Sequence, residues 1–128
     1  MILLLDTSTP LCKLTLVNEN SRYHDEWQAD RQLAKGLLKY LQEQLQKNDK
    51  TFADIKGIGV FAGPGSFTGL RIGLTVLNTI ASSENIPIVG AKGDNWQTEV
   101  IEKLTAGTDE EIVLPFYGSE AHITKPRK

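Results

Sequence analysis

The first thirty residues alternate between apolar runs and polar turns, as short β-strands do. The continuous apolar run 2–5 predicts a central strand buried on both faces. Apolar and polar positions alternate over 13–16, which predicts a second strand whose solvent-exposed face includes Thr15. A polar turn at 18–20 leads into 22–28, a heavily charged stretch typical of a protected edge strand. These segments therefore predict three strands joined as hairpins.

The hydrophobic period then lengthens to that of an α-helix. Leucines recur on one face between 33 and 45, and Asp30 is a natural N-cap for this helix. Gly36 lies inside it and costs about 1 kcal/mol of helix propensity relative to alanine. We interpret Gly36 either as a tolerated irregularity or as a small residue that lets another helix approach closely.

The rest of the chain alternates between strands and helices. The pattern predicts strands at 57–61, 88–90 and 112–114, and helices at 68–83 and 96–104. Asp94 is expected to cap the last helix, which carries a Glu99–Lys103 pair on its surface. Pro115 is expected to stop the final short strand.

The predicted order is β-β-β-α-β-α-β-α, which indicates an α/β fold with helices packed on a mixed sheet. This order is similar to one lobe of the ribonuclease-H-like, actin-type architecture. The 128 residues show no internal repeat, low-complexity tract or linker that would divide them. We therefore expect one domain.

The helix predicted at 68–83 has a wider apolar surface than one sheet face requires. At about 100° per residue, its apolar residues and glycines form two stripes, the first comprising Leu70, Leu74, Leu77 and Ala81, and the second Ile72, Val76, Ile80, Gly69 and Gly73. Together they span roughly 200°, about twice the width expected of a surface helix. The second stripe packs either on the neighbouring helix or on another subunit, and its glycines favour the subunit.

A glycine-rich turn precedes this helix, in the string Gly-Pro-Gly-Ser-Phe-Thr-Gly-Leu-Arg-Ile-Gly at 63–73. Gly63 and Gly65 flank a proline, so the backbone needs tight or left-handed turns here. Ser66 or Thr68 is expected to cap the helix. The free N–H groups of such a helix start form a ready anion site. The signal is weak, because the spacing fits neither a P-loop nor a dinucleotide fingerprint.

Composition and charge narrow the class of protein. The formal net charge of -2 provides no global positive field for nucleic acid. We favour a solvated end for the basic residues at 125–128, with a phosphate contact as the alternative. Cys12 is the only cysteine, which excludes an internal disulfide and fits a reducing cytosol. The run 2–5 is too short for a signal or a membrane span. We expect a soluble, unprocessed, cytoplasmic protein.

Three segments carry a family resemblance. The string at 63–73, Leu-Leu-Leu-Asp-Thr-Ser at 3–8 and Asn-Ile-Pro-Ile-Val-Gly at 85–90 closely resemble the TsaB family, once called YeaZ. The resemblance covers most of 1–95 in order and spacing. It implies a non-catalytic subunit of the bacterial machine that makes threonylcarbamoyladenosine next to the tRNA anticodon. It also implies pairing with TsaD, which holds the metal and transfers the threonylcarbamoyl group, and the participation of an ATPase, TsaE.

The resemblance also implies a pairing surface. In the family, helices of the N-terminal lobe contact TsaD, which points here to 68–83 and to the helix at 30–46. The residues expected at this interface are Leu37, Leu41, Gly69, Arg71, Ile72, Gly73, Leu74, Val76, Leu77 and Ile80. An isolated chain is expected to form a homodimer if the same surface meets itself.

The sequence departs from the family in two respects. Usual members have two lobes, whereas here 115–118 already resembles the Pro-x-Tyr ending of the family. We interpret 1–118 as a single lobe with the second lobe reduced to 105–111, and 119–128 as a tail. The family's common His-Ser near the first long helix is also replaced, by Leu33-Ala34.

Catalysis is the weaker hypothesis. Actin-type proteins place a phosphate- or metal-binding acid at the end of the first strand, but the second wall of that cleft is missing here, so a turn role for Asp6 is favoured. His24 and His122 have no zinc-ligand spacing, and Ser66 has no histidine nearby in sequence.

The alternative to the scaffold is a minimal nucleotide-binding domain. Its phosphate-binding residues would be Asp6, Thr7, Gly63, Gly65, Ser66 and Thr68. This alternative predicts that the isolated chain binds ATP or ADP, and in its milder version the nucleotide binds only at the joint with TsaD. The scaffold hypothesis needs no cofactor of its own.

Overall fold

The computed structural model of the protein describes residues 1–116. Within this range the central feature is a five-stranded sheet with the order β3-β2-β1-β4-β5. The strands are β1 (Ile2–Asp6), β2 (Leu11–Val17), β3 (Arg22–Gln28), β4 (Gly57–Phe61) and β5 (Ile88–Ala91). The helices are α1 (Leu33–Lys47), α2 (Phe67–Glu84) and α3 (Trp96–Thr105), with short 3₁₀ turns at η1 (Asp30–Gln32) and η2 (Phe52–Asp54). The predicted order of elements is confirmed.

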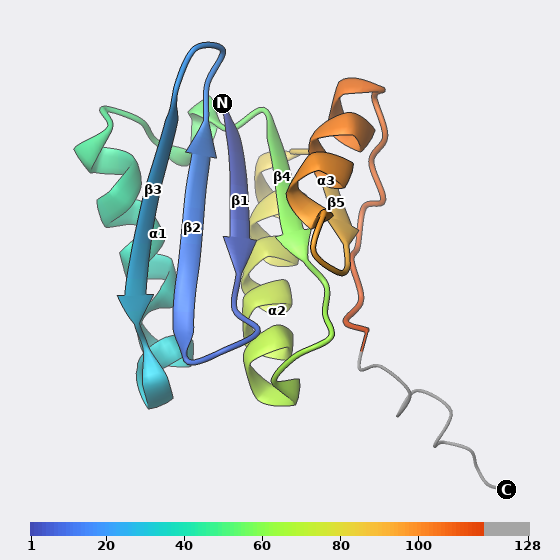
Figure 1. The fold of residues 1–128 in the computed structure, drawn as a ribbon. Helices are drawn as coiled ribbons and strands as arrows, with labels where there is room; N and C mark the ends of the chain where they lie inside the picture. The colour runs from blue at the N-terminus through green and yellow to red at the C-terminus, as the bar shows by residue number, and fades with distance from the viewer. Residues whose placement is uncertain (117–128) are drawn as a thin grey trace, which may run out of the picture.

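The sheet is mixed, as the sequence predicts. β1, β2 and β3 form antiparallel hairpins, whereas β4 and β5 run parallel to β1 after helical crossovers (Figure 1). The prediction that Thr15 lies on a solvent-exposed face of β2 is wrong, because Thr15 is buried. Its cross-strand partner is His24, whose Nδ1 lies 3.0 Å from the Thr15 hydroxyl oxygen. A polar cross-strand partner therefore covers this threonine.

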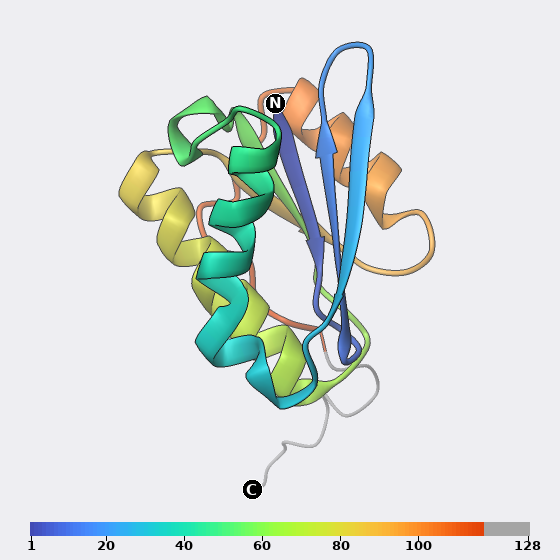
Figure 2. The ribbon, with the colours of Figure 1, turned by 90° about the vertical axis from the view of Figure 1, so that its left-hand side faces the viewer.

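Helices cover both faces of the sheet. Figure 2 shows α1 and α2 side by side on one face and α3 on the other. Leu3 and Leu5 of β1 belong to the larger core under α1 and α2, while Leu4 belongs to the smaller core with Val100 of α3. Full burial of one leucine side chain contributes about 1.5–3 kcal/mol. The apolar run 2–5 thus serves two cores, because successive side chains of a strand point to opposite faces.

The predicted caps of two helices are wrong. Asp30 opens the turn η1 with φ 48°, and its carboxylate accepts a hydrogen bond from Gln28 Nε2 at 2.8 Å. α1 therefore begins only at Leu33, without a side-chain cap. Asp94 does not cap α3 either, because Trp96 N–H donates to the Gly93 carbonyl and closes that turn through the backbone.

Two other helix predictions are confirmed. Ser66 is the N-cap of α2, where its hydroxyl oxygen accepts from the N–H of Gly69 at 3.2 Å. Lys103 and Glu99 form the expected pair on α3 at 3.7 Å. Within residues 1–116, no helix combines the length and the apolar character needed to cross a bilayer.

The strand predicted at 112–114 is absent from the described residues. Val113 is buried there, but its N–H and C=O both bond the side chain of Asn78 on α2, at 2.9 Å each. Because these backbone groups are taken by a helix side chain, the segment forms no ladder with β5. We call residues 109–116, which follow the outer edge of the sheet, the C-terminal strap.

Gly36 makes room for an aromatic ring. A Cβ atom built on Gly36 would lie 2.8 Å from the Trp27 ring of β3, which also stacks on Tyr40 at a centroid distance of 5.0 Å. The interpretation of Gly36 as a site of close helix–helix approach is therefore wrong. A side chain here would push Trp27 away from α1.

Candidate functional site

A groove between α1 and α2 is the strongest candidate for a functional surface. It has a volume of about 410 Å³, and its lining residues are Ala34, Thr68, Arg71, Ile72, Thr75 and Val76. A neighbouring hollow of about 300 Å³ shares Ala34, Thr68 and Ile72 and extends towards Pro10 and Arg31. The two hollows form one depression along the helix pair.

Exposed apolar side chains extend this depression. Leu38 lies one helical turn after Ala34 on α1 and is 48% exposed. Phe67, at the start of α2, is 55% exposed, and the guanidinium carbon of Arg71 lies 5.2 Å from its ring centroid. We call Ala34, Leu38, Phe67, Arg71, Ile72 and Val76 the α1–α2 surface. An aromatic ring and an arginine beside aliphatic side chains are typical of protein interfaces.

The structure divides the predicted interface residues into two sets. Ile72 and Val76 are half-buried, Gly69 is also half-buried, and Arg71 is exposed. The others lie in the core of the chain itself: Leu37, Leu41, Gly73, Leu74, Leu77 and Ile80. A side chain covered by its own chain cannot contact a partner directly, so these six are removed from the proposed surface.

The glycines of α2 pack on the end of β1. A Cβ atom at Gly69 would collide with the carbonyl oxygen of Thr7, and one at Gly73 with the Thr7 hydroxyl. The Thr7 hydroxyl also donates to the Gly69 carbonyl at 2.8 Å. The argument that these glycines favour a subunit contact is therefore wrong, because they allow α2 to approach its own sheet.

Two exposed apolar members of the α1–α2 surface, Leu38 and Phe67, are not among the interface residues expected from the sequence. Leu38 lies beside the buried leucines of α1, and Phe67 lies inside the glycine-rich string. A helical wheel alone could have identified Leu38, because it lies about 100° from Leu37. Phe67 gave no signal, since its exposure depends on the direction in which α2 leaves the turn.

The candidate phosphate-binding residues lie together at the carboxyl ends of β1 and β4. The Asp6 carboxylate accepts from the N–H of Ser8 at 2.8 Å, which is an Asx turn. The N–H of Ser66 donates to the Ser8 carbonyl at 2.8 Å, and Gly65 packs on Ser8. Side chains of Asp6, Thr7 and Ser66 are thus bonded within the chain, while Thr68 is exposed.

Gly63 has the left-handed backbone that the sequence predicts, with φ 126°. A Cβ atom there would collide with the carbonyl oxygen of Phe116, at the end of the C-terminal strap. The N–H of Phe116 donates to the Ala62 carbonyl at 2.6 Å, and the Lys92 amine lies 3.8 Å from the Phe116 ring centroid. The strap therefore lies over the turn that was a candidate phosphate loop.

The buried titratable side chains fit structural roles. Burial, together with the smaller effect of the carboxylates of Asp6 and Asp25, raises the pKa of Cys12 to about 12. Burial also raises the pKa of Tyr40, whose hydroxyl donates to Asp25 at 2.6 Å. A thiol held protonated is a poor nucleophile. Among residues 1–116, no cluster of three or more His, Cys, Asp or Glu side chains could hold a metal ion.

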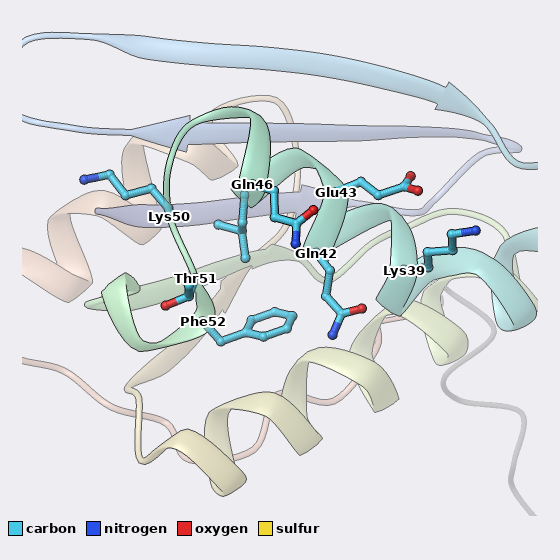
Figure 3. A pocket seen from close by; sticks show the side chains of 8 residues that line it. Lys39, Gln42, Glu43, Gln46, Lys50, Thr51 and Phe52 are labelled. Carbon is cyan, nitrogen blue, oxygen red and sulfur yellow. The ribbon is translucent and has the colours of Figure 1, made fainter.

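A third hollow lies at the other end of α1. It has a volume of about 440 Å³ and is lined by Lys39, Gln42, Glu43, Leu45, Gln46, Lys50, Thr51 and Phe52. Figure 3 shows Gln42 and Gln46 on the side of α1 that faces the Phe52 ring. Its charges are mixed in sign, so we assign no ligand to it.

The fold and this surface define a class of protein, a ribonuclease-H-like, actin-type lobe with an apolar helix pair. The family model described as "TsaD: tRNA N6-adenosine threonylcarbamoyltransferase" matches residues 23–92, more than half of the chain. This match shows that the chain belongs to the family that the model describes. The relatives described next, to which the chain is similar, are TsaB (YeaZ) proteins.

Two curated relatives and one solved structure support this assignment. The TsaB protein of Buchnera aphidicola subsp. Baizongia pistaciae is 35% identical over 88 residues, which is 69% of this chain and 40% of that protein. The TsaB protein of Escherichia coli is 30% identical over 89 residues, 70% of this chain and 38% of that protein. YeaZ from Pseudomonas aeruginosa superposes with a TM-score of 0.67 at 28% identity, covering 71% of this chain and 43% of that one.

The chain thus spans about two fifths of the length of these relatives. The interpretation of 105–111 as a reduced second lobe stays a prediction. His122, the predicted tail 119–128 and its basic end lie outside the described residues.

Proposed function

We propose that this chain acts in the biosynthesis of tRNA threonylcarbamoyladenosine as a non-catalytic subunit. Its α1–α2 surface would pair with a TsaD-like catalytic subunit, a TsaE-like ATPase would join the pair, and tRNA would be bound by the complex. The supporting observation is the depression between α1 and α2, flanked by the exposed Leu38 and Phe67. The two curated relatives are named for threonylcarbamoyladenosine biosynthesis.

The shape of the surface supports a helical partner. A groove between two neighbouring helices accepts the ridge of a third helix, so that a bundle forms. A partner with the same fold would offer a helix pair of its own, and the family match to TsaD makes such a partner a natural choice. The same geometry allows a second copy of this chain to bind in the partner's absence.

The side chains available for chemistry support a role without catalysis. Asp6 bonds the backbone of Ser8, and Thr7 bonds that of Gly69, so neither is directed to a ligand. The Cys12 thiol is buried and protonated at neutral pH. We therefore expect the chain to contribute surface rather than reacting groups.

Nucleotide binding by the isolated chain is the weaker proposal. The carboxylate at the end of β1 is used in a turn, and Phe116 of the strap lies against Gly63. These contacts therefore engage two of the residues to which this alternative assigns phosphate binding. Titration with ATP and ADP is expected to give no binding heat with the chain alone, and saturable binding there would favour this alternative.

Co-purification with the TsaD-like subunit of the same organism tests the pairing. Ile72→Glu places a charge in the groove, whereas Ile112→Glu is the matched control, because Ile112 is 64% exposed on the strap. Loss of one well-packed interface side chain costs about 2 kcal/mol or more, so Ile72→Glu is expected to bind about thirtyfold more weakly.

Both variants must retain the circular dichroism of the wild-type chain. Ile112→Glu is expected to bind like wild type. Equal binding by both variants, or absence of a wild-type complex, would contradict pairing through this surface.

A further inference from the structure

The outer edge of β5 is covered by contacts from other parts of the chain. β5 is the last strand of the sheet in the described residues and pairs with β4 on one side only. The backbone groups of β5 that face β4 bond that strand and the residues flanking it. The N–H and C=O groups of Ile88 and Gly90 therefore point away from β4, towards the outer edge of the sheet. An exposed row of such groups is a template for another strand.

Every outward group of these two residues has a partner within the chain. The N–H of Ile88 donates to the Asp109 carboxylate at 3.1 Å, and the Ile88 carbonyl accepts from the N–H of Glu110 at 2.9 Å. The N–H of Gly90 donates to the Glu110 carboxylate at 2.8 Å, and the Gly90 carbonyl accepts from the Lys103 amine at 2.7 Å. One backbone group and three side chains thus replace a neighbouring strand.

The C-terminal strap is held from its other side as well. Lys103 and Glu110 form an ion pair at 3.0 Å, which fixes the two side chains that bond Gly90. Val113 packs against the bare Cα of Gly90, and its backbone bonds Asn78 of α2. The strap is therefore tied to α2, α3 and β5 at once.

We infer that the C-terminal strap, with Lys103, closes the β5 edge against strand addition by a second copy of this chain. The second copy is the relevant partner because β5 is uncharged, with the sequence Ile-Val-Gly-Ala, whereas the opposite edge, β3, carries charged residues of both signs. Two β5 edges related by a twofold axis would pair antiparallel and bond the same outward groups. This inference does not depend on the proposed function.

The test removes the carboxylates that bond β5. The double variant Asp109→Ala/Glu110→Ala leaves the N–H groups of Ile88 and Gly90 without their acceptors. Glu111→Ala is the matched control, since it removes a neighbouring exposed carboxylate that makes none of the hydrogen bonds to Ile88 and Gly90 described above. Molar mass is measured by light scattering over a roughly hundredfold range of concentration, because dimerisation follows mass action.

The double variant is expected to change from monomer to dimer as its concentration rises, at concentrations where the control and the wild type remain at one mass. Adding Ile72→Glu must leave this association intact. A double variant with the mass behaviour of the control would overturn the inference, and so would a dimer abolished by Ile72→Glu, which would place the contact on the α1–α2 surface.

Hydrogen exchange of the wild-type chain provides a second test that needs no variant. The amides of Ile88 and Gly90 are expected to exchange slowly in dilute solution, together with the amide of Val113. Exchange of Ile88 and Gly90 at the rate of the exposed turn at 18–20 would show that the strap does not close the edge, and would overturn the inference even if the double variant failed to fold.

Discussion

Polar side chains that resemble a ligand site serve the fold in this chain. Asp6 closes a turn, Thr7 joins β1 to α2, and Ser66 caps α2. The prediction that these three residues lie close together is correct, because the carboxyl ends of parallel strands meet at one edge of a sheet. The sequence could not show that their hydrogen bonds are made within the chain, since that depends on atomic positions.

Cys12 makes stability sensitive to alkaline pH. Burial raises its pKa to about 12 from an ordinary value of 9.0, so the unfolded chain loses this proton first as the pH rises. The stabilisation that comes from the protonated Cys12 thiol is therefore fully present below about pH 9. The free energy of unfolding is expected to fall between pH 9 and pH 12, by roughly 1.4 kcal/mol per pH unit for one proton. Urea unfolding at a series of pH values measures this slope.

Cys12→Ala is the control for that slope. The variant is expected to show a shallower fall, which begins only as Tyr40 titrates, since the pKa of Tyr40 is also raised above its ordinary value of 10.0. The same slope in wild type and variant would mean that the thiol is not the group that titrates.

Helix α2 packs on the sheet with one face and lines the groove beside α1 with another. Its first stripe packs on the sheet, and the groove residues Ile72 and Val76 lie beside α1. The wide apolar arc was a correct prediction from sequence, but the role of the glycines was not. Periodicity gives the faces of a helix, whereas the neighbour that each face meets is set by the tertiary fold.

Gly69→Ala tests the contact between α2 and β1. Alanine gains about 1 kcal/mol of helix propensity, but overpacking in a well-packed core costs about 1–3 kcal/mol. The colliding atom is the carbonyl oxygen of Thr7, and a backbone atom yields less than a side chain. We expect a net loss of about 1 kcal/mol or more in the free energy of unfolding, measured with denaturant.

Ser83→Ala is the matched control on the same helix, because Ser83 is exposed. It is expected to leave stability unchanged or slightly higher. Greater stability in Gly69→Ala than in wild type would show that Thr7 does not constrain this glycine.

Elements with strong periodicity were predicted well, and their ends were not. The apolar run at 2–5 forms a strand that buries leucines on both faces, and the run at 57–61 forms one that buries Ile58 and Val60 on the face of the larger core. Asp30 and Asp94 have the right chemistry for caps, but local backbone geometry decides whether a carboxylate reaches the helix N–H groups. The segment 112–114 has strand composition, yet Asn78 takes its backbone bonds.

Within residues 1–116, both edges of the sheet are protected and the α1–α2 helix pair carries an exposed depression. Charged side chains protect β3, and the C-terminal strap covers β5. The depression between α1 and α2 retains half-buried aliphatic side chains. The sequence placed the expected interface on α1 and α2, which line this depression, but it included buried residues such as Leu37 and Leu77 because a helical stripe does not distinguish core from interface.

Hydrogen exchange of the chain, alone and mixed with the TsaD-like subunit, tests the central claim most directly. Pairing through the α1–α2 surface predicts slower exchange in the first half of α1 and in α2 around Ile72 and Val76, with β3 and α3 unchanged. Protection confined to β3 or α3, or no protection anywhere at saturating partner, would contradict the proposed role.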